Sequence, residues 1–347
     1  MALHVVHADP RTDPRWARLV ALSPDATVFH SPEWLRAVSS TYGLQPVASL
    51  LCDGETVIGG TVSARIDDPR GTRLVSFPFS DFMDPLVESC EQWRLLAADL
   101  LAEPLPFRAR VRRARWLLDD PDLQTEAIGY WHAVDVTTED AQWAALGGSA
   151  RRNIRRAHDS GLSIEIGSTI EQIREFFDLH RQVRKHKYRL LPQPWTFFEQ
   201  LHAAFEPELR LHVLLARQGG VAVGGILALA WGDTLYYKFN ASALGQLGVR
   251  PNDLLAWEAI GLARRLGLAR LDFGFSDADQ PGLVRYKRKF ATVESPVHRV
   301  SRTAELPPSG GAAFGRDLTA LTAILTDPRV PDDLTEAAGA LLYHYFA

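Results

Sequence analysis

One order of helical and strand-like segments occurs twice along this chain, and that repetition constrains the fold more than any other feature of the sequence. The first half has a helical segment over 32–40, β-rich runs over 46–51, 56–66 and 73–79, a helix over 90–101 and an extended run over 107–114. The second half has helices over 170–188 and 195–204, β-rich runs over 211–216, 221–230 and 234–240, a helix from 251 and a buried run over 269–273. The pattern predicts a duplicated α/β unit rather than a doubly wound sheet.

The length of the chain also favours two units. Its 347 residues, 46% of them apolar, exceed what one hydrophobic core of roughly 250 to 300 residues holds. A polar, Arg-rich stretch over 137–161 separates the two runs of alternation. We therefore predict an N-terminal domain over 1–145, a C-terminal domain over 146–305 and a helical tail over 306–347.

The two cysteines, Cys52 and Cys90, form no CxxC pair, and the 11 histidines show no HExxH spacing. A disulfide framework and a metal site are therefore not expected. The N-terminus lacks a basic start followed by an apolar run, and no stretch reaches 18 apolar residues. We expect a cytoplasmic protein without a membrane span.

Basic residues are placed unevenly, although the net charge is only −4. The run at 107–116 would put Arg108, Arg110 and Arg112 on one face of a strand, where they could bind phosphate. The alternative is a solvated edge strand protected by its charge. Sequence alone leaves both open, with the edge strand favoured.

Two further basic clusters lie at 149–157 and 181–189. The first contains Arg151, Arg152, Arg155 and Arg156, and could hold a polyanion through phosphate contacts. A helical face paired with nearby acids explains it equally well. In the second cluster Arg184 and Tyr188 are four residues apart, so a helix would place both on one face.

Lysine is rare, since only five of the 38 basic residues are Lys, and two of them, Lys287 and Lys289, follow Tyr286. A lysine there could offset negative charge developing on a carbonyl oxygen. The alternative is a surface strand with alternating basic residues. No serine lies in a GxSxG elbow and neither cysteine has a catalytic signature around it, so covalent catalysis is not favoured.

Seven motifs in order resemble FemABX-like proteins of the acetyltransferase (GNAT) superfold, over about residues 29 to 300. They are FHSPEWL at 29–35, SFPFSD at 76–81, RNIRRA at 152–157, YYKFNAS at 236–242, PNDLLAWEAI at 251–260, LDFG at 271–274 and GLVRYKRKF at 282–290. The resemblance implies tandem GNAT-like α/β domains, each a mixed, mostly antiparallel sheet flanked by helices, with a C-terminal helical tail.

The resemblance also implies an activity, the transfer of an aminoacyl group from aminoacyl-tRNA to an amine on a small molecule or peptide, without a resident cofactor. Lys287 occupies the position of the family's lysine that stabilises the tetrahedral intermediate. The implied substrate-binding residues are Arg184, Tyr188, Tyr237, Tyr286, Arg36 and Asp81. The implied tRNA-binding residues are Arg151, Arg152, Arg155, Arg156 and Lys289.

Two departures and two alternatives accompany this resemblance. The family often has a lysine shortly after the first-domain Trp, whereas Trp34 is followed by Leu35 and then Arg36. No long coiled-coil insertion is present.

An acetyl-CoA-dependent N-acetyltransferase would share the fold but needs a glycine-containing pyrophosphate loop. The stretch 246–251 has the wrong spacing for such a loop and ends in Pro251, which lacks an N–H. A noncatalytic RNA-binding protein would need the arginines but not Lys287.

Overall fold

A computed structural model describes residues 3–302 and 311–347 of the chain and divides them into two compact units. The first unit consists of the described parts of Met1–Gly129 and Pro296–Leu318, with Ala347. The second consists of Tyr130–Ser295 and Thr319–Phe346. Each unit is a sheet with helices on its faces.

The first unit begins with β1 (Leu3–Ala8), α1 (Pro14–Leu22), α2 (Pro32–Tyr42), β2 (Pro46–Asp53), β3 (Thr56–Asp68) and β4 (Gly71–Ser76). It continues with α3 (Cys90–Leu100), β5 (Phe107–Val111), α4 (Arg115–Leu118) and the start of β6 (Gln124–Asp135). Its strand order is β1-β2-β3-β4-β5-β12, where β12 is Val293–Arg302. The pairs are antiparallel except β4 with β5, which are parallel.

Local sequence explains the limits of these helices. Ser31 caps α2 by accepting a hydrogen bond from the Trp34 amide at 3.1 Å, and Pro32 occupies the first turn, where its missing N–H costs nothing. Gly43 ends the helix at φ 70°, a conformation that glycine adopts without strain. Helix α3 packs Trp93 and Leu96 on Phe107 and Val111 of β5 to form the core of this unit.

The second unit contains the end of β6 and then α5 (Glu139–Ala145), α6 (Gly148–Asp159), β7 (Ser163–Gly167), α7 (Ile170–Gln182) and α8 (Trp195–Phe205). The meander β8 (Leu211–Gln218), β9 (Val221–Trp231) and β10 (Thr234–Ser242) follows, and then α9 (Pro251–Arg265), β11 (Arg270–Asp277), α10 (Pro281–Lys287) and the start of β12. The strand order is β6-β11-β10-β9-β8-β7. The hairpins are antiparallel, and β10 pairs with β11 in parallel.

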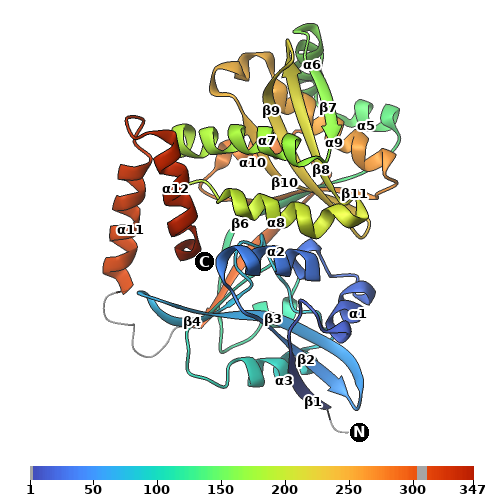
Figure 1. Ribbon diagram of the computed structural model, residues 1–347. Helices are drawn as coiled ribbons and strands as arrows, with labels where there is room; N and C mark the ends of the chain where they lie inside the picture. The colour runs from blue at the N-terminus through green and yellow to red at the C-terminus, as the bar shows by residue number, and fades with distance from the viewer. Residues whose placement is uncertain (1–2, 303–310) are drawn as a thin grey trace. The chain divides into compact units, whose positions relative to one another are not determined.

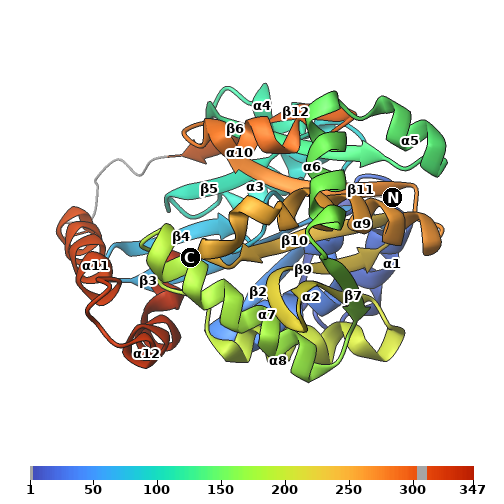
Figure 2. The same ribbon diagram turned by 90° about the horizontal axis from the view of Figure 1, so that it is seen from above.

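Helices cover both faces of the second sheet (Figures 1 and 2). On one face α6 and α9 bury Ile154, Leu255 and Ile260 against Leu214 and other sheet residues. On the opposite face α7 and α8 pack a cluster of aromatic side chains onto β9 and β10. The mixed, mostly antiparallel, helix-flanked architecture predicted from the sequence is confirmed.

The two repeats exchange their last strands. Strand β6 ends the first repeat, yet its residues from Tyr130 onward belong to the second unit and lie beside β11. Strand β12 ends the second repeat, yet from Pro296 onward it belongs to the first unit and pairs with β5. The division therefore falls between Gly129 and Tyr130 and differs from the predicted boundary after residue 145. The other predicted boundary, at 305/306, lies outside the described residues.

The predicted C-terminal helices are present as α11 (Gly311–Leu325) and α12 (Asp332–Leu342). Within the second unit, α12 packs on the end of α7, where Lys185 Nζ donates to Asp332 Oδ1 at 2.6 Å and Arg181 pairs with Glu336 at 3.1 Å. Lys185 is only 2% exposed, so the ion pair holds a charge that burial would otherwise disfavour.

Strand β5 differs from the expectation for the basic run at 107–114. It ends at Val111, so Arg112 is outside the strand, and it lies between β4 and β12 rather than at an edge. The edge-strand explanation for its arginines is therefore wrong.

Buried histidines predict how the stability of the chain depends on pH. Burial, with a smaller effect of the Arg184 charge, lowers the pKa of His180 to about 3, although Gln193 opposes the shift. The folded chain therefore binds fewer protons than the unfolded chain between about pH 3 and the ordinary histidine pKa near 6.5. Stability should be complete above that ordinary value and fall as the pH drops below it. Thermal unfolding from pH 8 to pH 4 checks this, and His180→Phe should show a shallower fall than wild type.

Candidate functional site

Strands β10 and β11 pair in parallel only over Thr234–Tyr236 and Arg270–Asp272, although β10 continues to Ser242 and β11 to Asp277. A register shift between Tyr237 and Phe239 interrupts the pairing of β10 with β9 at the same level. Such a bulge bends the strand and redirects its side chains. The two parallel strands therefore separate just after Tyr236, and the candidate site is built where they part.

Asp272 and Gly274 shape this point of β11. The Asp272 carboxylate is 5% exposed and accepts hydrogen bonds from Trp131 Nε1 at 2.8 Å and from the Gly274 amide at 2.6 Å. Gly274 has φ 70°, which a side chain would strain. The turn presents the backbone oxygens of Gly274 and Phe275 to helix α10.

Lys287 is the last residue of α10 and occupies this position. Its ammonium donates to the oxygen of Gly274 at 3.0 Å and to that of Phe275 at 2.8 Å, and the residue is 5% exposed. The structure gives the stretch after Gly282 as a helix, so the surface-strand alternative is wrong. A buried positive charge is thus fixed beside the point where the strands separate.

A second buried group lies near Lys287. His132 of β6 is fully buried, and its Nε2 is 2.8 Å from Glu294 Oε2 of β12, which also pairs with Arg288 at 2.6 Å. Burial and the Lys287 charge lower the pKa of His132, and Glu294 opposes this shift. The imidazole is therefore neutral near pH 7, so it adds no positive charge next to Lys287.

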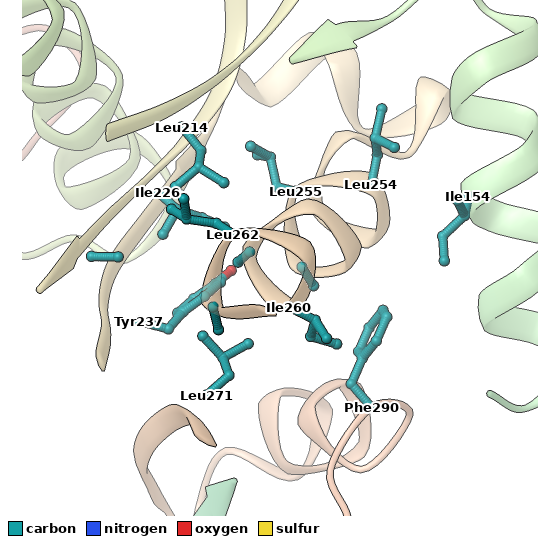
Figure 3. Close-up of a cluster of buried hydrophobic side chains, with 14 of the residues drawn as sticks. Ile154, Leu214, Ile226, Tyr237, Leu254, Leu255, Ile260, Leu262, Leu271 and Phe290 are labelled. Carbon is teal, nitrogen blue, oxygen red and sulfur yellow. The ribbon is translucent and has the colours of Figure 1, made fainter. Parts of the chain in front are cut away.

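Tyr237 and Tyr286 face the same region from β10 and α10. Tyr286 donates to the backbone oxygen of Asn252 at 2.8 Å, and burial raises the pKa of both phenols. In Figure 3 Tyr237 lies among the apolar side chains between the sheet and α9, near Leu271. Both hydroxyls stay protonated at neutral pH and can act as hydrogen-bond donors.

The first turn of α9 is filled by polar contacts. Asn252 Oδ1 accepts from Ser242 Oγ at 2.5 Å and from Asn240 Nδ2 at 3.1 Å. Asp253 is 4% exposed and pairs with Lys289 at 3.0 Å. Lys289, which was expected to contact tRNA, therefore forms an ion pair with a buried carboxylate.

Arg184 lies on a π-helical turn, Val183–Lys187, that continues α7, and Tyr188 follows directly as its C-cap. The turn is closed by the Tyr188 amide donating to the Val183 oxygen at 3.2 Å. Arg184 donates to the Leu191 oxygen at 3.0 Å and to the Tyr343 hydroxyl at 3.4 Å. Tyr188 is 50% exposed, and the Lys187 ammonium lies 4.9 Å from the centre of its ring. Arg184 is thus held by Leu191 and Tyr343, whereas half of Tyr188 is open to solvent.

Arg36 and Asp81 belong to the first unit. Arg36, on α2, donates to the Arg11 backbone oxygen at 3.1 Å and lies 3.6 Å from Glu33. Asp81 lies in the loop after β4 and is partly buried. Trp34 Nε1 donates to Ser80 Oγ at 3.0 Å, so α2 and this loop are joined next to both residues.

The four arginines of α6 lie away from its buried face. Ala150, Ile154 and Ala157 pack inward, whereas Arg152, Arg155 and Arg156 are exposed and Arg151 is partly exposed. None of the four has an acidic partner among residues 3–302 and 311–347. Arg155 stacks over Trp143 with its guanidinium carbon 5.6 Å from the ring centre. This face is a patch of uncompensated positive charge.

In the first unit, a carboxylate of the chain occupies the backbone amides just before α4. Asp84 Oδ1 accepts from the amides of Arg112, Arg113 and Ala114 at 2.8 to 2.9 Å, just before α4. All five lysines lie between 185 and 289, so this unit has no counterpart of Lys287. No group of metal-binding side chains occurs in the described residues. Among their helices, none has the length and apolar character to cross a bilayer.

Residues 148–288, all in the second unit, match the model of the acetyltransferase (GNAT) domain. The second unit thus contains a segment similar to the acetyltransferase (GNAT) domain family. Lys287 and the separating strands β10 and β11 lie inside the matched GNAT segment. No curated protein matches the sequence.

Solved structures show the same fold over most of the chain. FemX is 14% identical with a TM-score of 0.67, and the match covers 85% of this chain and 96% of that chain. A tandem GNAT protein from the clavulanic acid biosynthesis pathway is 12% identical with a TM-score of 0.55, covering 86% and 98%. L-PGS from Bacillus licheniformis is 10% identical with a TM-score of 0.53, covering 92% and 97%. The expected tandem GNAT architecture is thus confirmed as a fold.

The buried pair of His132 and Glu294 and the ion pair of Asp253 were not predictable from local sequence. His132 and Glu294 are 162 positions apart, and no local pattern links them. Asp253 stands in the PNDLLAWEAI motif, where an acid in the first turn of a helix usually has a capping role. Its pairing with Lys289 depends on how α10 folds back onto α9.

Proposed function

We propose that the chain is an aminoacyl-tRNA-dependent N-acyltransferase that forms an amide bond on an amine acceptor. The observation that carries the proposal is the buried ammonium of Lys287, held by the oxygens of Gly274 and Phe275 where β10 and β11 separate. The GNAT domain supports acyl transfer in general. The aminoacyl-tRNA donor is inferred from the FemABX-like motifs that run through both repeats.

The chemistry requires positioning and charge stabilisation. The neutral amine attacks the ester carbonyl of the charged tRNA, the new C–N bond forms, and negative charge develops on the carbonyl oxygen. The C–O bond to the tRNA then breaks, and the proton lost by the amine ends on the released tRNA hydroxyl. Lys287 would stabilise the oxyanion, because a fixed charge in a buried site needs little reorganisation during the reaction.

The α6 arginines support the tRNA donor. Their charge is not neutralised by acids in the described parts of the chain, and exposed guanidinium groups bind backbone phosphates. Lys289 contributes less than the sequence suggests, because Asp253 already pairs with it. Charged tRNA would serve as a co-substrate, and the reaction needs no resident cofactor.

The acceptor is proposed to be an amine on a small molecule or peptide, held by Tyr188, Tyr237 and Tyr286. Tyr188 is the most accessible of the three. Arg184 would position the segment that carries Tyr188 and would not bind the acceptor itself. Its guanidinium already donates to the Leu191 oxygen and the Tyr343 hydroxyl. Arg36 and Asp81, in the first unit, are proposed as substrate-binding residues from the FemABX-like motifs alone.

An acetyl-CoA-dependent N-acetyltransferase is the second candidate, favoured by the description of the matching domain. A pyrophosphate would need free amides at the start of α9. There Pro251 has no N–H, and the buried carboxylate of Asp253 lies in the same turn. These features weigh against acetyl-CoA and support the tRNA donor.

Binding of charged tRNA and of acetyl-CoA, measured side by side at low and moderate ionic strength, tests the proposal. We expect salt-sensitive tRNA binding and no acetyl-CoA binding. Arg155→Gln should reduce the salt dependence by about one phosphate contact, whereas Arg265→Gln, an exposed arginine of α9, should not. Binding of acetyl-CoA alone would favour the second candidate. If the chain binds tRNA but transfers no aminoacyl group to any amine, it is a noncatalytic RNA-binding protein.

A further inference from the structure

The stretch 183–190, which follows α7 in the second unit, has an unusual backbone. Its first five residues form the π-helical turn, and Arg189 has φ 55°, a conformation that a residue with a side chain rarely adopts. Such a backbone persists only where the surrounding structure fixes it, and it is common at functional sites. The stretch leaves Tyr188 50% exposed, although Lys185 and Leu191 on either side are buried.

The carboxylate of Asp332, in the first turn of α12, is one of the groups that fix this stretch (Figure 1). Its Oδ1 accepts from Lys185 Nζ at 2.6 Å and lies 3.2 Å from His186 Nε2, and its Oδ2 accepts from Gln182 Nε2 at 2.6 Å. Three side chains from the end of α7 and the turn therefore meet at one carboxylate. Because Lys185 is 2% exposed, loss of the Asp332 charge would leave a buried ammonium without its counter-charge.

The same C-terminal segment holds the backbone that follows the turn. Arg189 Nη1 donates to the Thr326 oxygen at 2.8 Å. Gly339 of α12 lies so close to the Pro192 backbone that a Cβ atom at 339 would come within 2.4 Å of the Pro192 oxygen. Helix α12 therefore rests directly on the chain after the turn, within the second unit.

We propose that Asp332 is a positioning residue of the acceptor site, because it holds the stretch 183–190 in the shape that presents Tyr188 to a peptide amine. The inference rests on the acyl transfer proposed above, in which Tyr188 holds the acceptor. A buried ion pair and a close backbone contact fix the stretch, while Tyr188 and the neighbouring Leu190, which is 39% exposed, remain open to a ligand. A phenol beside an aliphatic side chain suits a peptide, which offers both polar groups and carbon surface. Asp332 acts only through the turn.

Amide hydrogen exchange on the full chain tests whether Asp332 fixes the stretch. The amides of Tyr188 and Leu190 each donate a hydrogen bond to an oxygen within the stretch, at 3.2 and 2.9 Å, so both report its shape. We expect Asp332→Asn to speed their exchange at least about tenfold, because an unpaired buried ammonium destabilises the turn. Asp333→Asn removes the neighbouring exposed carboxylate and should leave the exchange at the wild-type rate. Unchanged exchange in Asp332→Asn would overturn the inference.

Acyl transfer from charged tRNA to two amines tests the consequence for the acceptor. Hydroxylamine has no peptide groups for Tyr188 to hold, whereas trialanine has them. We expect Asp332→Asn to raise the KM for trialanine at least about tenfold with little change in kcat, and to use hydroxylamine like wild type. Asp333→Asn should match wild type with both amines. Tyr188→Ala should raise the KM for trialanine by a similar factor, and the double variant no further, because both changes remove the same contact.

The possible outcomes separate this inference from the proposed function. Asp332→Glu keeps the carboxylate and should recover most of the affinity for trialanine. If Asp332→Asn loses activity equally with both amines, Asp332 has only a general structural role. If wild type uses hydroxylamine but not trialanine, or if Asp332→Asn keeps the wild-type KM for trialanine, Asp332 does not position an acceptor site. If wild type transfers to neither amine, the proposed acyl transfer itself fails, and the inference fails with it.

Discussion

Replacing Lys287 by methionine is expected to lower the rate of acyl transfer by at least about a hundredfold, the usual effect of removing one oxyanion-stabilising group. Methionine keeps most of the side-chain volume next to Gly274 and removes only the charge and its donors. The measurement is transfer of a labelled aminoacyl group from charged tRNA to hydroxylamine, used as a general amine acceptor, after subtraction of the uncatalysed rate.

Two controls separate catalysis from folding. Lys187→Met removes an exposed lysine from the same unit and should leave the rate unchanged. The unfolding temperature of Lys287→Met shows whether loss of the hydrogen bonds to Gly274 and Phe275 has disrupted the fold. A folded Lys287→Met protein with the wild-type rate would show that Lys287 is structural.

The Phe198→Ala substitution should produce the largest loss of stability, about 3–5 kcal/mol for the second unit. Phe198 is fully buried on α8, and its ring lies 5.3 Å from that of Phe177 and 5.5 Å from that of Phe239. It thus joins α8 to both α7 and β10. Truncation leaves a cavity that three separate elements would have to close.

Guanidinium unfolding, followed by circular dichroism, measures this loss. Phe346→Ala is the matched control, since Phe346 is 42% exposed and its truncation should cost much less. A loss below about 1 kcal/mol for Phe198→Ala would mean that the aromatic cluster repacks around the smaller side chain.

Segments with a clear period and clear ends were predictable. Helix α2 begins after Ser31 with Pro32 and ends at Gly43, so capping chemistry within the segment sets its limits. Strands β8, β9 and β10 have alternating or continuous apolar residues, and turns that contain glycine separate them. Lys287 attracted attention in the sequence because it is a rare lysine in a family motif, and its catalytic role stays a prediction.

Other elements have no strong local pattern. Strand β1 has only six residues, most of them exposed or partly exposed, and β12 contains Pro296 and several polar residues. Each becomes a strand because its partner, β2 or β5, supplies the hydrogen bonds. The change of α7 into a π-helical turn likewise occurs where Lys185 bonds to Asp332 of the distant α12.

The sequence by itself determined the duplicated order of elements and the limits of helices such as α2, α3 and α8, since these depend on residues within a few turns of each other. Only the tertiary structure decided the exchange of β6 and β12, the His132–Glu294 pair and the place of β5 inside the sheet. The physical reason is that strand pairing and buried charge pairs join residues that are far apart in the chain. Their energies depend on register and burial, which a local pattern does not contain.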